Sequence, residues 1–190
     1  MQTKIIICIM LCSTLSFGQT STESFPYYEI PPYPESYSAG TVAARQIDGL
    51  GFRFYWATEG LTEKDLSYRP SDSSRTTFET ISHIYNLSKI IANAALEKEN
   101  GNNDQSQLSY EELRHEVLMN LKMASDALKD SDDLTKNMII FGERKFPFWH
   151  NINGPIADAI WHSGQIAIFR RVTGNPINPN ISHFSGTVKK

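Results

Sequence analysis

Three side chains in this sequence have the chemistry to hold a divalent metal ion, provided that the fold brings them together. Asp158 and His162 are four residues apart, so an α-helix would place the carboxylate and the imidazole one turn apart on the same face. His83 lies in a second segment of helical pattern, 80–87. One histidine from one helix and an Asp-x-x-x-His pair from another form a three-ligand set that leaves positions open for water or substrate. The sequence therefore predicts a metal site at His83, Asp158 and His162.

Two further residues are predicted to orient these ligands. Gln165 and Tyr85 are close to them in the sequence, and hydrogen bonds from neighbouring groups commonly hold metal-bound imidazoles in place. Zinc, nickel and iron all suit two imidazoles and a carboxylate, so the sequence predicts a divalent metal without naming it. An alternative without metal is also open: Asp158 would then hold the imidazole of His162 as a structural hydrogen-bonded pair in a buried helix.

The segment that carries the Asp-x-x-x-His pair is predicted to be one helix over 153–173. Pro155 suits the first helical position, where the missing N–H costs nothing. Gly174 and Pro176 mark the end of the helix, because glycine can adopt the left-handed conformation and proline cannot continue the hydrogen-bond ladder. Most of the circumference is apolar, so we expect this helix to be well buried, with Trp161 in the core.

Apolar residues recur at three- and four-residue spacing in three further segments, 41–59, 76–97 and 109–129. The second and third begin with the capping-box pattern Ser/Thr-x-x-Glu, at Thr76 and Ser109. No strand pattern is persuasive. Four helices of this length predict an all-α protein, a four-helix bundle.

Residues 1–18 have the pattern of a signal peptide. Lys4 supplies a positive charge, the apolar run that follows is too short to span a membrane, and cleavage is expected before Gln19. A lipoprotein anchor at Cys12 is disfavoured, because bulky residues stand where small ones are required before that cysteine. We therefore expect an exported protein, periplasmic or extracellular, with no stable membrane anchor. After the signal peptide, the chain is predicted to form an extended Pro- and Tyr-rich arm over 19–40, the bundle over 41–176 and a tail over 177–190.

Composition narrows the chemistry further. Both cysteines, Cys8 and Cys12, lie in the predicted signal peptide, so the mature protein would have no disulfide and no cysteine nucleophile. The formal net charge of −3 argues against nucleic acid as a partner. No nucleophile turn for a serine relay is recognisable, so any catalysis would use the metal. The substrate would be a small molecule of unknown identity, and a homodimer is one option for the assembly.

Three segments taken in order resemble the DinB-like superfamily of four-helix bundles, over most of the mature chain. Residues 60–70 resemble that family's link between its first two helices, and 80–84 resemble its second-helix histidine segment. Residues 161–176, with Trp-His-Ser-Gly-Gln-Ile at the start and Gly-Asn-Pro at the end, resemble its last helix. The resemblance implies a long crossover that spans the bundle, at either 100–106 or 130–142.

The resemblance also implies a metal and a choice of functions. Family members commonly bind a divalent metal through one histidine of the second helix and a His-x-x-x-His pair of the last, so His83 and His162 match and Asp158 replaces the other histidine. Enzymatic members include metal-dependent thiol transferases, which implies a hydrolase or thiol-transferase-type activity here. The alternative is a non-catalytic helical module that binds a partner or ligand, with Asp158 and His162 as a structural pair.

Overall fold

The computed structural model describes residues 25–101 and 108–189, and this part of the chain is mostly helical. This confirms the predicted all-α class at the level of secondary structure. The predicted signal peptide, 1–18, lies outside the described residues. The long helices of the described part are α1 (Ala39–Thr58), α3 (Thr77–Ala95), α4 (Tyr110–Lys129) and α6 (Ala157–Val172).

The beginnings of α3 and α4 are fixed by the predicted capping boxes. Oε2 of Glu79 accepts a hydrogen bond from the backbone N–H of Thr76 at 2.7 Å, and the Thr76 hydroxyl accepts from the N–H of Glu79 at 3.1 Å. Ser109 and Glu112 repeat this exchange at 2.8 and 3.3 Å. Each pair satisfies two N–H groups that a helix would otherwise leave without a partner.

The last helix differs from the prediction at its beginning. A short helix, α5 (Phe148–Asn151), leads into a π-helical turn, η1 (Ile152–Ile156), and that turn continues directly into α6. Pro155 therefore lies inside a helical segment, and the prediction that it occupies the first position was wrong. Because proline has no N–H and its ring displaces the preceding carbonyl, it disturbs the regular ladder, and the wider π turn accommodates that disturbance.

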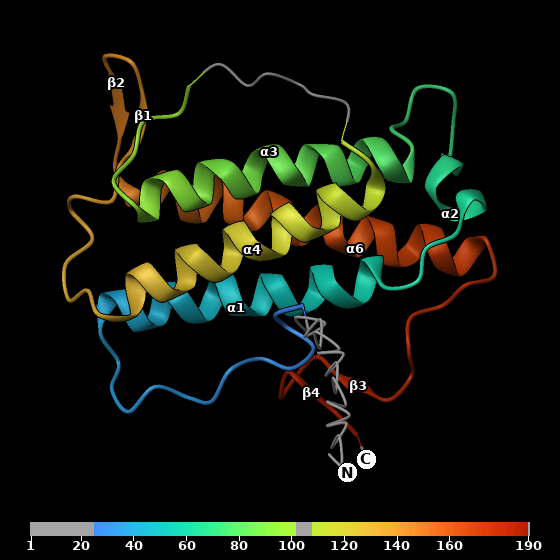
Figure 1. Cartoon of the computed structure of the whole chain (residues 1–190), viewed down its shortest axis with the longest axis horizontal. Helices are drawn as coiled ribbons and strands as arrows, with labels where there is room; N and C mark the ends of the chain where they lie inside the picture. Colours follow the sequence, from blue (N-terminus) through green and yellow to red (C-terminus); the bar gives the residue numbers. More distant parts are fainter. Residues whose placement is uncertain (1–24, 102–107, 190) are drawn as a thin grey trace, which may run out of the picture.

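The long helices pack around one apolar core. Helix α1 contacts α4 and α6, and α3 contacts the same two helices (Figure 1). In the figure α1 and α6 run from left to right, whereas α3 and α4 run from right to left. Fully buried side chains from all four helices fill the space between them, among them Ile47, Leu50, Phe54, Ile81, Ile84, Ile91, Leu118, Leu121 and Ile166.

Helices α3 and α4 run in the same direction, so the end of α3 and the beginning of α4 lie at opposite ends of the helices. The first of the two predicted crossovers, 100–106, lies mostly outside the described residues. The connection 130–142 begins and ends at one end of the helices instead. Its last residues belong to a hairpin that the sequence did not predict, because strands of three residues are too short to show an alternating pattern. The hairpin pairs β1 (Ile139–Phe141) with β2 (Arg144–Phe146).

Smaller elements complete the described part of the chain. Helix α2 (Glu63–Ser67) interrupts the link between α1 and α3, and the tail contains a hairpin of β3 (Ile181–Ser182) and β4 (Thr187–Val188). Within the described ranges, no helix combines the length and the apolar character needed to cross a membrane.

Tyr27 inserts the described part of the N-terminal arm into the core. Tyr27 is 4 % exposed and belongs to the apolar core, in a backbone conformation with φ of 73°. Its ring lies against Gly51 of α1, so closely that a Cβ at that position would come within 2.5 Å of it. The absence of a side chain at Gly51 therefore allows the ring of Tyr27 to pack against α1.

A smaller part of the circumference of α6 is buried than its apolar composition suggested. Trp161 is 73 % exposed and Ile168 is 58 % exposed, so the prediction that Trp161 lies in the core was wrong. These two residues are seven apart and share an outward face, whereas Ala159, Ser163 and Ile166 form the buried one. The number of apolar residues in a helix does not show which of them meet a neighbouring helix.

Candidate metal centre

The three predicted ligands come from two helices that touch each other. His83 is on α3, Asp158 and His162 are on α6, and these helices are in direct contact. The buried neighbours Ile84 and Ala159 hold the two helices at the core. The ligands project from the edge of that contact and are partly exposed. The fold therefore brings a residue near the start of α3 to a pair 75 residues later in the chain.

The polar atoms of the three side chains converge on one point. Nε2 of His83 lies 3.1 Å from Oδ2 of Asp158, and Nε2 of His162 lies 3.4 Å from Oδ1 of the same carboxylate. The two imidazole rings are nearly perpendicular, with centroids 4.8 Å apart. One ligand atom from each residue lies within 4.8 Å of the others, so this group could hold a metal ion. In the ranges 25–101 and 108–189, no other group of three histidine, cysteine or acidic side chains does so.

The site is covered on one side and open on the other. The side chain of His162 is 15 % exposed, that of His83 is 28 % exposed and that of Asp158 is 40 % exposed. A bound ion would thus be held from the protein side and could take water or substrate from the open side.

Gln165 contacts the site as the sequence prediction requires. Its Oε1 lies 2.7 Å from Nδ1 of His162, one helical turn away on α6. With the amide oxygen as the acceptor, Nδ1 is the donor, and the lone pair of the neutral imidazole is on Nε2. Nε2 is also the nitrogen that faces Asp158. Gln165 therefore selects the tautomer of His162 that can coordinate a metal from the side of the other ligands.

Tyr85, the other residue predicted to orient the ligands, is not brought to this site. It lines a separate hollow with Phe25, His115 and Glu116, and its ring lies under Nζ of Lys89. Two residues along a helix correspond to a rotation of about 200°, so Tyr85 points away from the side of α3 that carries His83. Being only two residues from His83 in the sequence therefore does not bring Tyr85 to the same side of the helix.

A cavity of about 300 Å³ lies directly beside His162. Helix α6 contributes His162, Gln165 and Phe169 to its wall, and the link before α3 contributes Arg75. The remaining lining residues are Pro70, Ser74 and Thr80. Sequence analysis did not single out Arg75, because its proximity to His162 depends on the path of the link, which no local pattern reveals. Of the three candidate ligands, His162 alone lines this cavity.

A network around Asp65 holds the link and helix α2 against the end of α6. The Asp65 carboxylate is 1 % exposed and accepts hydrogen bonds from the Thr173 hydroxyl, from the backbone N–H and hydroxyl of Thr62 at 2.8 and 2.7 Å, and from the Asn175 amide at 2.8 Å. Burial by itself would raise the pKa of Asp65, but these hydrogen bonds outweigh it and lower the pKa to about 2.

Arg170 connects the same end of α6 to α1. Its guanidinium is buried and donates to the carbonyl oxygen of Trp56 at 2.8 Å and to that of Ala57 at 3.2 Å, near the end of α1. Its Nε donates to the carbonyl oxygen of Asn175 at 2.7 Å. Arg170 thus satisfies carbonyl groups that the end of α1 would leave without a partner, a structural role for this arginine.

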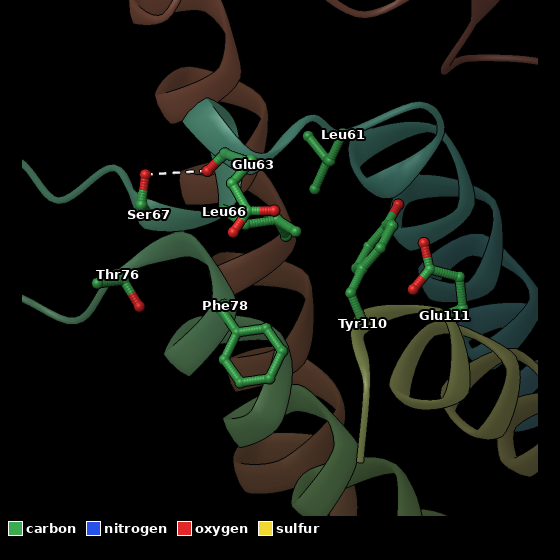
Figure 2. A pocket seen from close by; sticks show the side chains of 8 residues that line it. All are labelled: Leu61, Glu63, Leu66, Ser67, Thr76, Phe78, Tyr110 and Glu111. Atoms are coloured by element: carbon green, nitrogen blue, oxygen red, sulfur yellow. Dashed lines mark hydrogen bonds between the residues drawn. The ribbon is translucent and has the colours of Figure 1, made fainter. Parts of the chain in front are cut away.

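A larger hollow of about 500 Å³ opens on another side of the link (Figure 2). Phe78 and Tyr110 lie around it together with Leu61 and Leu66, and Glu63 and Glu111 lie at its edge. None of the three candidate metal ligands lines it. This hollow is larger than the cavity beside His162, but only the smaller cavity is lined by a candidate ligand, His162.

Comparison of the chain with protein-family models, with curated proteins and with solved structures finds no match in any of the three. The case for a function therefore depends on the geometry of the site itself.

Proposed function

We propose that this protein is an exported DinB-like four-helix bundle that binds one divalent metal ion through His83, Asp158 and His162. The observation that carries the proposal is the convergence of these three side chains, from two helices, with all ligand atoms within 4.8 Å of one another. The proton that Gln165 holds on Nδ1 of His162 supports it, because that proton leaves Nε2 free to coordinate.

The ligand types favour zinc, nickel or iron. Two imidazole nitrogens and one carboxylate oxygen are suitable donors for all three ions, whereas calcium and magnesium prefer oxygen donors alone. Three protein ligands correspond to a catalytic type of site, since a structural zinc site is usually closed by four.

The proposed activity is that of a metal-dependent hydrolase or thiol-transferase-type enzyme acting on a small molecule. A divalent ion here would lower the pKa of a bound water or thiol and stabilise negative charge that develops on the substrate. The residues of the chain have separate tasks: Gln165 fixes the orientation of His162, and the cavity beside His162 admits the substrate. The open side of the site gives water access to the ligands.

A second function is compatible with the same distances. Asp158 lies 3.1 Å from Nε2 of His83 and 3.4 Å from Nε2 of His162. With a proton on Nε2 of each ring, Asp158 can accept from His83 and His162 directly, as the polar clasp of a non-catalytic binding module in which Asp158 and His162 are a structural pair. In that case the three side chains would stabilise the contact between α3 and α6 and take up no ion.

Metal analysis of protein purified without an affinity tag separates the two functions. The proposal expects about one equivalent of zinc, nickel or iron per chain, removed by dialysis against a chelator and restored by the free ion. Protein that copurifies with no metal and takes up none would leave only the structural clasp.

Export is tested separately. We propose cleavage before Gln19, and the N-terminal sequence of protein recovered from its native compartment should begin there. An intact N-terminus would show that the segment is retained as an anchor.

A further inference from the structure

We propose that Arg75 anchors an acidic group on a small substrate whose other end reaches the metal held by His83, Asp158 and His162. This inference rests on the metal site proposed above and adds the class of substrate, a small anion with a carboxylate or phosphate remote from the reacting end.

The cavity beside His162 connects the two ends of such a substrate. Its wall includes the ligand His162 and the supporting Gln165 on one helix, and Arg75 and Ser74 on the link before α3. Its volume of about 300 Å³ is at the lower end of the range for small-molecule sites. Of the three candidate ligands only His162 lines this cavity, so a molecule of a few carbon atoms bound here would contact Arg75 at one end and reach the candidate site at His162.

The guanidinium of Arg75 is available to an outside anion. Over the described ranges of the chain it forms no hydrogen bond or ion pair, and its charge contributes to lowering the pKa of the Glu79 carboxylate. That carboxylate is already engaged, since it accepts from the backbone N–H of Thr76 at 2.7 Å and lies 3.7 Å from Nη2 of Arg69. A planar guanidinium with free donors binds a carboxylate or phosphate through two parallel hydrogen bonds.

The distance and the charges define the shape of the ligand. Arg75 lies just before α3, which begins at Thr77. Along the helix axis, the six residues from Thr77 to His83 correspond to about 9 Å. A divalent ion with one carboxylate ligand would give the inner end of the cavity a net positive charge, and Arg75 is positive as well. Both ends therefore favour negative groups, and Phe169, packed edge-on against Tyr68 with ring centroids 5.6 Å apart, offers an apolar wall for the spacer.

The test compares hydroxamates on the zinc-loaded protein, because a hydroxamate binds zinc through its own two oxygens. Acetohydroxamate has no second acid group. The monohydroxamates of succinate and glutarate carry a carboxylate on a short spacer, and phosphonoacetohydroxamate carries a phosphonate. Calorimetric titration should show that at least one acidic hydroxamate binds wild type about tenfold more tightly than acetohydroxamate. Which acid is preferred separates a carboxylate substrate from a phosphate one.

Arg75→Gln should abolish this preference and leave zinc content and acetohydroxamate affinity unchanged. Arg69→Gln is the matched control: Arg69 lies in the same link and pairs with Glu79, outside the cavity lining, so this variant should keep the preference. The proposed role of Arg75 is wrong if zinc-loaded wild type binds all hydroxamates equally or binds none, or if Arg75→Gln keeps the preference. None of these results would contradict the metal site itself. Protein that takes up none of zinc, nickel and iron overturns both, and its metal content shows this before any hydroxamate is added.

Discussion

Oε1 of Gln165 lies 2.7 Å from Nδ1 of His162, one turn away on α6 and within hydrogen-bond distance. The amide oxygen can only accept, so Nδ1 donates and Nε2 is left as a lone-pair donor. Nε2 is also the atom that faces Asp158 at 3.4 Å. A residue one turn further along α6 thus leaves Nε2 of His162 available to an ion that Asp158 and His83 could also bind.

Gln165→Ala should weaken zinc binding by about 10- to 100-fold, because the imidazole would lose the hydrogen bond that sets its tautomer and orientation. The stability of the metal-free protein should change little, since alanine is a good helix former. Competition titration against a zinc-sensitive dye measures the affinity. Gln46→Ala, an exposed glutamine on α1, is the matched control, and an equal loss in both variants would argue against a role for Gln165 in metal binding.

Asp158→His should retain metal binding, and Asp158→Ala should lose most of it. A histidine at this position would supply a third imidazole, which zinc accepts as readily as a carboxylate, so uptake of one equivalent should persist. Alanine leaves only two ligands, and zinc affinity should fall by at least about 100-fold. Zinc titration of the metal-free variants measures both. If Asp158 were instead a clasp between two imidazoles, both metal-free variants would have lower melting temperatures than wild type, and zinc would raise the melting temperature of neither wild type nor Asp158→Ala.

Asp65→Asn should destabilise the protein at neutral pH by about 2 kcal/mol, the free energy that corresponds to a pKa lowered from 3.8 to about 2. Because the folded-state pKa is lower than the unfolded one, ionised Asp65 contributes its full stabilisation above pH 3.8, and this is lost as the pH falls to about 2. The difference between wild type and variant in urea denaturation should therefore narrow between pH 4 and pH 2.

The control for this prediction is Asp72→Asn. Asp72 is exposed and forms no hydrogen bond among the described residues, so the variant should match wild type at neutral pH. A constant difference between wild type and Asp65→Asn across the acidic range would show that the carboxylate charge contributes no stability.

Gly51→Ala should destabilise the protein by about 1–3 kcal/mol, because the new methyl group would overlap the ring of Tyr27. In a Tyr27→Ala background the same substitution should be neutral or stabilising, since the obstacle is gone and alanine favours the helix. Gly164→Ala is the control on α6, where a Cβ would meet nothing within 4 Å. Additive effects at Gly51 and Tyr27 in denaturant unfolding would contradict the close packing of the arm on α1.

The long helices could be predicted from the sequence because their signals are local. Capping boxes at Thr76 and Ser109 and the apolar spacing after them place α3 and α4 to within a few residues. The beginning of the last helix was missed because Pro155 is tolerated in a π turn, and this depends on how η1 packs against α3. Local pattern defines a helix but not the irregularities that its neighbours stabilise.

The candidate site could be predicted only in part, for the same reason. The spacing of Asp158 and His162 fixes their shared face, so these two could be paired from the sequence, and Gln165 follows at another turn. The place of Arg75 depends on how the link folds around α2, and Tyr85 points away because an offset of two residues turns it about 200° around α3.

The most direct measurement of the central claim is a set of melting curves for wild type and His162→Ala, each with chelator and with added zinc or nickel. The account predicts that one of these ions raises the melting temperature of wild type by several degrees through binding to the folded state. His162→Ala should stay folded, as its helical circular dichroism would show, and should give no shift with either ion. A wild-type melting temperature that is the same with chelator and with either ion, in protein that copurifies with no metal, would contradict the metal centre.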